Sequence, residues 1–95
     1  KALKYINMAI SVNAKNIFTL NLRGLLKSKI RDYAGALADY NNNILLFPGE
    51  WRTYVLRGKL KFEHLADKAG ACNDFRKAKE LGSDSAPQLI QENCQ

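Results

Sequence analysis

The sequence has little of what a catalytic or metal-binding protein needs. It contains one histidine and one tryptophan, and its two cysteines are too few for a disulfide framework and match no zinc-site spacing. Its six glycines stand singly, so no glycine-rich loop could cradle a phosphate group. The longest apolar runs, such as residues 44–47, are far too short to cross a bilayer. These absences argue against an enzyme, a cofactor, a metal ion and membrane insertion.

The few reactive side chains that do occur have ordinary explanations. His64 stands beside Glu63 near the expected end of a helix and is interpreted as a surface residue. Cys72 and Cys94 are expected on neighbouring helices, where a disulfide and two half-buried thiols are equally compatible with the sequence. The net charge of +6 permits attraction to acidic partners without requiring it.

An internal repeat is the most informative feature of the chain. The pattern Leu-Arg-Gly-x-Leu-Lys occurs at residues 22–27 and again at 56–61, so Gly58 repeats Gly24 with an offset of 34. Farther along, residues 32–40 are echoed at 67–75 with an offset of 35, which places one inserted residue between the two matches. A period of 34 predicts a helical solenoid, and a turn accepts one extra residue at little cost.

Hydrophobic periodicity and turn residues divide the chain into six helical segments and no strand. The expected helices cover residues 2–12, 17–29, 33–46, 51–64, 68–81 and 84–94. The second is expected to carry Leu20, Leu22, Leu26 and Ile30 on its apolar face. Gly82 and Ser83 read as a stop and a cap before the last, short helix, which suits a C-terminal capping role. The sequence therefore predicts an all-α fold, an α-solenoid of antiparallel two-helix repeats.

The predicted single domain, residues 1–95, has four parts. Residues 1–16 hold the second helix of a partial repeat, 17–50 and 51–85 are full repeats, and 84–95 form the capping helix. The first helix of the partial repeat is missing, so the apolar side of residues 2–12 needs cover. Either the chain is a piece of a longer array, or copies form a homo-oligomer through Ala2, Ile6 and Ile10.

With these residues in place, the chain resembles the tetratricopeptide repeat (TPR) family. That pattern has a large apolar residue, a Leu-Gly pair, a small residue followed four later by an aromatic, and a closing proline. The matching positions, expected to pack the repeats, are Leu20, Gly24, Ala36, Tyr40 and Pro48, then Tyr54, Gly58, Ala71 and Phe75. The departures are Arg23 and Arg57 for leucine, Lys27 and Lys61 for an aromatic, Asn43 for a small residue, and no proline after Leu81.

The two arginines that replace leucine each have an aspartate at a matching distance along the chain. Asp39 follows Arg23 with an offset of 16, and Asp74 follows Arg57 with an offset of 17, the difference being the inserted residue. We expect each arginine to pair with the aspartate of its own two-helix unit.

The end of the chain, residues 70–94, resembles the C-terminal repeat and cap of bacterial members of the family, often from Bacteroidetes. This resemblance implies that the end of the array is near. It leaves the compartment open between the bacterial cytoplasm and the cell envelope.

The resemblance also implies a non-catalytic scaffold that binds a peptide or protein segment on the concave face, lined by the first helix of each repeat. Carried over by helix position, the lining is Phe18, Asn21, Leu25, Ser28, Arg52, Val55, Lys59 and Phe62. Two cations and two phenylalanines favour an acidic or amphipathic partner.

Two other ligand classes are weaker expectations. Leu25 and Leu56 stand where the family's carboxylate clamp has asparagine, so a chaperone-tail grip is not expected. A basic solenoid that reads RNA is the remaining alternative, but two repeats supply too few base-stacking side chains for specific nucleic-acid binding.

Overall fold

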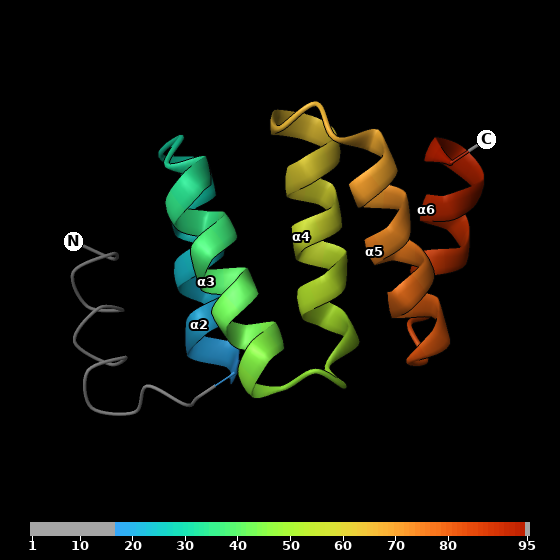
Figure 1. Cartoon of the computed structure of the whole chain (residues 1–95), viewed down its shortest axis with the longest axis horizontal. Helices are drawn as coiled ribbons and strands as arrows, with labels where there is room; N and C mark the ends of the chain where they lie inside the picture. The colour runs from blue at the N-terminus through green and yellow to red at the C-terminus, as the bar shows by residue number, and fades with distance from the viewer. Residues whose placement is uncertain (1–16, 95) are drawn as a thin grey trace. The chain divides into compact units, whose positions relative to one another are not determined.

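A computed structural model describes residues 17–94 of the chain, which hold five helices and no strand (Figure 1). The helices are α2 (Ile17–Lys29), α3 (Tyr33–Leu46), α4 (Trp51–His64), α5 (Lys68–Glu80) and α6 (Ala86–Asn93). This confirms the predicted all-α fold class. The predicted helix over residues 2–12, with Ala2, Ile6 and Ile10, lies outside the described residues.

The chain divides into two compact units at the junction of Pro48 and Gly49. In the first unit, α2 packs against α3 as an antiparallel hairpin. In the second, α4 and α5 form an equivalent hairpin, and α6 packs against α5. The junction falls in the turn that the sequence analysis placed between its two full repeats.

The turn inside each hairpin shows where the inserted residue goes. The backbone N–H of Asp32 donates to the carbonyl of Lys27 at 2.8 Å, and that of Asp67 donates to the carbonyl of Lys61 at 3.0 Å. These bonds join equivalent residues, although the second spans one residue more. In both turns the residue before the aspartate has a positive φ, which ends the preceding helix: Arg31 (67°) and Ala66 (52°). The turn therefore absorbs the insertion.

The second helix of each hairpin begins with the same cap. The carboxylate of Asp32 accepts a hydrogen bond from the backbone N–H of Gly35 at 3.0 Å. The carboxylate of Asp67 accepts one from Gly70 at 2.9 Å. An aspartate at this position satisfies an otherwise unpaired amide of the first turn, so α3 and α5 start at equivalent places in the repeat.

A glycine on the first helix allows an aromatic ring on the second to approach its backbone. A Cβ atom built on Gly24 would lie 2.5 Å from Cε1 of Tyr40, and one on Gly58 would lie 2.6 Å from Cε1 of Phe75. Both rings are almost completely buried. Other predicted packing positions are also buried, namely Leu20, Ala36, Tyr54 and Ala71. Pro48 is exposed, just beyond the C-cap of α3.

The apolar face predicted for α2 needs a correction. Leu22 is 44% exposed and Ile30 is 62% exposed, so neither belongs to the core. The residues that α2 buries are Leu20, Asn21 and Gly24. Because successive residues of an α-helix are about 100° apart, Leu22 lies about 200° around the axis from Leu20. The two leucines cannot face the same neighbour, and Leu22 is left on the surface.

The helix ends near the C-terminus also differ slightly from the prediction. Helix α5 ends at Glu80, where Gly82 (φ 104°) and Ser83 donate backbone hydrogen bonds to the carbonyls of Lys79 and Ala78. Helix α6 begins at Ala86, two residues later than expected. Ser85 occupies the N-cap position without a side-chain capping bond. The hydroxyl of Ser83, two residues earlier, accepts a hydrogen bond from the Ala86 N–H at 3.1 Å and so satisfies an amide of the first turn.

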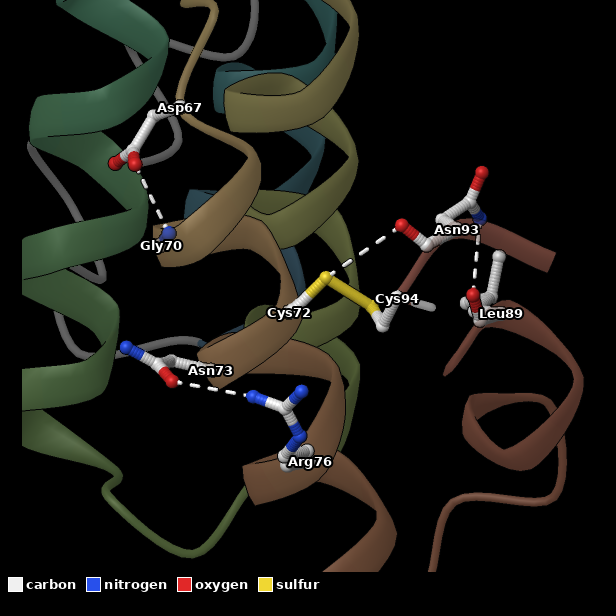
Figure 2. Close-up of a disulfide and its surroundings, with 8 residues drawn as sticks. All are labelled: Asp67, Gly70, Cys72, Asn73, Arg76, Leu89, Asn93 and Cys94. Carbon is white, nitrogen blue, oxygen red and sulfur yellow. Dashed lines mark hydrogen bonds between the residues drawn. A yellow bond between two sulfur atoms is a disulfide. The ribbon is translucent and has the colours of Figure 1, made fainter. Parts of the chain in front are cut away.

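A disulfide joins Cys72 of α5 to Cys94 at the end of α6 (Figure 2). The two Cα atoms are 5.7 Å apart, within the usual range for a disulfide. The sequence was equally compatible with two thiols, and the structure shows the bridge. It fastens the end of an eight-residue helix, a length too short to be stable alone.

Replacing Gly58 by alanine tests the contact between glycine and ring. The new Cβ would meet the Phe75 ring at 2.6 Å and the Ala71 carbonyl oxygen at 3.2 Å. We expect the overpacking to lower the free energy of unfolding by about 1–3 kcal/mol, measured by urea denaturation. Gly49→Ala is the control, because nothing lies within 4 Å of its Cβ position. Equal stability of the two variants would contradict the proposed close approach.

Candidate functional site

The predicted binding residues of α4 follow one side of the helix, but they are not equally accessible. Arg52 and Lys59 are exposed, and Phe62 is 39% exposed. Val55, which the sequence analysis placed among them, is buried. The accessible part of this face is called the α4 stripe: Arg52, Lys59 and Phe62.

The two cations of the α4 stripe have different surroundings. Arg52 donates from Nη1 to the Glu50 carboxylate at 2.7 Å, and its guanidinium lies 4.8 Å from the centre of the Trp51 ring. These contacts fix the orientation of the Arg52 side chain, and the Glu50 carboxylate offsets part of its positive charge. Within residues 17–94, no carboxylate pairs with Lys59, whose ammonium group is therefore available to a ligand.

The predicted binding residues of α2 are also divided between surface and core. Phe18 is 64% exposed and Leu25 is 37% exposed, whereas Ser28 is half-buried and Asn21 is buried. Leu22, predicted to face the core, lies four residues after Phe18 on the exposed side. The accessible face is called the α2 stripe: Phe18, Leu22 and Leu25. It is wholly apolar.

Asn21 faces inward because it binds Asn43 of α3. The Asn43 side-chain amide donates to Oδ1 of Asn21 at 2.6 Å and to the backbone carbonyl of Ile17 at 2.9 Å. Asn43 is fully buried. The equivalent positions of the second hairpin hold Val55 and Ala78, both buried. The first hairpin thus has a hydrogen-bonded amide pair at the position where the second has an apolar pair. The Asn21–Asn43 pair was not predicted from the sequence.

The predicted arginine–aspartate pairs are present in both hairpins. Nε of Arg23 donates to Asp39 at 2.8 Å, and Nε of Arg57 donates to Asp74 at 2.9 Å. In each pair Nη2 bonds the second carboxylate oxygen, so the contact is bidentate. Both aspartates are almost fully buried. These pairs join α2 to α3 and α4 to α5.

A lysine completes each buried pair. Nζ of Lys27 lies 3.5 Å from Asp39, and Nζ of Lys61 lies 3.4 Å from Asp74. From the sequence these lysines are recognised only as departures from the family pattern. The spacing Arg-x-x-x-Lys could have revealed them, because residues four apart share one face of a helix. Each buried carboxylate is therefore held by two cations.

The protonation states of these groups are fixed at physiological pH. The hydrogen bond to Asp39 raises the pKa of Arg23, and the bond to Asp74 raises the pKa of Arg57. Burial, followed by the nearby charge of Asp39, raises the pKa of Tyr40 to about 12. These groups therefore serve the fold, and none of them belongs to the α2 or α4 stripe.

In the part of the chain from residue 17 to residue 94, no three His, Cys, Asp or Glu side chains gather closely enough to hold a metal ion. None of its helices has the length and apolarity needed to cross a membrane.

Comparison with known proteins identifies the fold. No protein-family model matches the sequence, and no curated protein matches it significantly. A solved structure does match, described as the first TPR of Spaghetti (RPAP3) bound to the HSP90 peptide SRMEEVD. The TM-score is 0.84 at 19% identity, over 96% of this chain and 73% of that one. The chain therefore has the tetratricopeptide helical-repeat fold, while the resemblance to bacterial members stays a prediction.

A double-mutant cycle at Asn21 and Asn43 tests the amide pair. Asn43→Ala removes the donor to the buried Asn21 carbonyl, and we expect it to cost about 1–3 kcal/mol of unfolding free energy. Adding Asn21→Val gives the first hairpin the side chains that the second already has. We expect the double variant to recover at least half of that loss, measured by urea denaturation. Strictly additive losses would show that the two amides do not act as a pair.

Neutralising a buried aspartate tests the two-cation contact. In Asp74→Asn the side chain keeps its size but loses the charge that Arg57 and Lys61 share. We expect the free energy of unfolding to fall by about 1–3 kcal/mol. This is less than the cost of breaking a fully buried ion pair, because both cations are partly exposed. The control is Glu50→Gln at the exposed Arg52 pair, which should cost about 0–1 kcal/mol. If Asp74→Asn and Glu50→Gln lowered the free energy of unfolding equally, the buried carboxylate would not stabilise the hairpin more than an exposed ion pair does.

Proposed function

We propose that this chain is a non-catalytic scaffold that binds an acidic or amphipathic segment of another protein on the exposed faces of α2 and α4. The observation that carries the proposal is that the first helix of each hairpin has an accessible stripe that its hairpin core does not use. Lys59 is exposed as most lysines are, but the core of the first hairpin gives no reason for Phe18 to stand in solvent. A ligand that covers them would gain both apolar and electrostatic contacts.

The α4 stripe favours a ligand with negative charge. Lys59 has no carboxylate partner among the described residues, and Arg52 can exchange its exposed contact with Glu50 for a contact with a ligand. Phe62 supplies apolar surface on the same side of the helix. Acidic side chains with an apolar neighbour match this arrangement better than a purely apolar or a basic segment.

The α2 stripe favours apolar side chains. Phe18, Leu22 and Leu25 are spaced by four and three residues, which places them along one line on the helix surface. A segment that presents apolar side chains would bury this surface, since charged groups would lose hydration there without a partner. An amphipathic acidic segment carries the apolar side chains that suit the α2 stripe and the negative charge that suits the α4 stripe.

The structural match supports a peptide ligand of this kind. The RPAP3 domain is shown with the HSP90 peptide SRMEEVD, which carries three acidic residues beside a methionine and a valine. In this chain Leu25 and Leu56 occupy the places where a carboxylate clamp has asparagine. We infer that recognition uses acidic side chains of the ligand and does not depend on a free C-terminal carboxylate.

Peptide titration tests the proposal. SRMEEVD labelled with a fluorophore serves as the acidic, amphipathic probe, with binding followed by fluorescence anisotropy. We expect Arg52→Glu with Lys59→Glu to weaken binding about tenfold or more, because two attractions become repulsions. Amidation of the peptide C-terminus should change the affinity less than twofold.

The control variant reverses two exposed charges away from the α4 stripe, at Lys77 and Lys79 of α5. Its affinity should stay close to that of the unmodified chain at the same salt concentration. Equal weakening in both variants would indicate unspecific attraction to a basic protein. No loss on reversing Arg52 and Lys59 would contradict the role proposed for α4.

A further inference from the structure

A hollow on the second unit is lined by none of the residues of the α2 and α4 stripes. It has a volume of about 510 Å³ and opens along the first half of α5, against the end of α6. The residues that line it are Lys68, Ala69, Cys72, Asn73, Arg76 and Cys94. It is called the α5 hollow.

The α5 hollow has a defined wall because of the disulfide. Figure 2 shows the Cys72–Cys94 bond bridging α5 to the end of α6, with Asn73 and Arg76 on the same stretch of α5. The Cys72 sulfur lies 3.8 Å from the backbone carbonyl of Asn93. These contacts keep Cys94 beside the first half of α5, so the shape of the hollow depends on the closed bridge.

Two cations stand four residues to either side of Cys72. Lys68 precedes it and Arg76 follows it, so both lie on the side of α5 that carries the disulfide. Nη1 of Arg76 lies 3.5 Å from Oδ1 of Asn73, which draws the guanidinium back along the helix toward the hollow. Among the described residues, neither Lys68 nor Arg76 forms an ion pair with a carboxylate.

The nearby carboxylates are engaged elsewhere in the second unit. Asp67 caps α5 through the N–H of Gly70. Glu80 lies 4.0 Å from Lys77, and Glu92 accepts a hydrogen bond from Gln88 at 2.9 Å. The lining of the α5 hollow therefore holds two cations, one amide, an alanine and the disulfide, and it contains no acidic side chain.

We propose that the α5 hollow is a second binding site, which takes two carboxylates of an extended acidic peptide, one on Lys68 and one on Arg76, with the disulfide as its wall. The two cations are eight residues apart on one helix, or about 12 Å along its axis. An extended chain rises about 3.3 Å per residue and presents every second side chain to the same face. Glutamates four residues apart, about 13 Å, match that spacing. Asn73, which lies between the two cations along the helix, can bond the peptide backbone.

A pentapeptide probe tests the site directly. It carries glutamate at its first and last positions with Gly-Ser-Gly between them, and both ends are blocked. Titrated into the oxidised chain and followed by amide NMR, it should shift the signals of Ala69, Cys72 and Asn73. The matching peptide with glutamine in place of glutamate should not shift them. Equal shifts from both peptides would overturn the proposal.

Charge-matched variants locate the contact. Lys68→Gln with Arg76→Gln should weaken binding about tenfold, the sum of two exposed ion pairs. Lys77→Gln with Lys79→Gln removes the same charge from the same helix outside the hollow, and it should change the affinity less than threefold. Equal loss in both variants would overturn the site, since net charge would then explain the binding.

Reduction of the Cys72–Cys94 disulfide tests whether it forms a wall of the α5 hollow. Dithiothreitol transfers two electrons and two protons to the disulfide, giving the Cys72 and Cys94 thiols and its own cyclic disulfide. The reduced chain should bind the pentapeptide at least threefold more weakly, because Cys94 is no longer held beside α5. Unchanged affinity would overturn the part proposed for the disulfide. The variant with Arg52→Glu and Lys59→Glu should still show the NMR shifts of Ala69, Cys72 and Asn73 when the pentapeptide is added. A failure of the α5 hollow proposal can therefore be distinguished from a failure of the proposed function at α4.

Discussion

The contact between an aromatic ring and a glycine sets the distance between the two helices of each hairpin. Tyr40 lies against Gly24, and Phe75 lies against Gly58, at separations that leave no room for a Cβ atom. Because the backbones approach this closely, a short aspartate on the second helix can reach an arginine and a lysine on the first. A wider hairpin would leave the aspartate charge buried without its cations, which is strongly unfavourable.

Much of this arrangement could be predicted from the sequence because the repeat supplies two independent copies of each constraint. A single arginine and aspartate at an offset of 16 would mean little, but the pair recurs at an offset of 17 across a one-residue insertion. The hydrogen bonds from Asp32 and Asp67 show why the offset changes, since the turn takes up the extra residue. Helix bounds followed from the caps. The error at α6 arose because Ser83 was expected to precede the helix directly, whereas the helix begins at Ala86 after Ser85, and the Ser83 hydroxyl bonds the Ala86 N–H from three residues away.

The candidate site was predicted less well, because family position does not determine whether a side chain faces its partner helix or the solvent. Asn21 was placed on the binding face, but Asn43 draws it into the core, and that partner could not be identified without knowing that the two helices bring them together. The opposite error occurs at Leu22, which was predicted to be in the core and is on the surface. The α5 hollow could not be predicted from the sequence for a related reason. It forms where α6 packs against α5 and the disulfide joins them, whereas the sequence was equally compatible with a disulfide and with two thiols.

The two hairpins show how one scaffold can vary its surface chemistry without changing its fold. Each core contains an aromatic ring, a glycine, a small residue and a buried carboxylate with two cations. One pair of buried positions differs, holding Asn21 and Asn43 in the first hairpin and Val55 and Ala78 in the second. The exposed stripe on the first helix takes no part in these contacts. It is apolar on α2 and has two cations beside Phe62 on α4, although the three positions that α2 buries are also buried in α4. Selection for a ligand can therefore act on the stripes separately from selection for stability, since a substitution there disturbs neither the close approach of the helices nor the buried carboxylates.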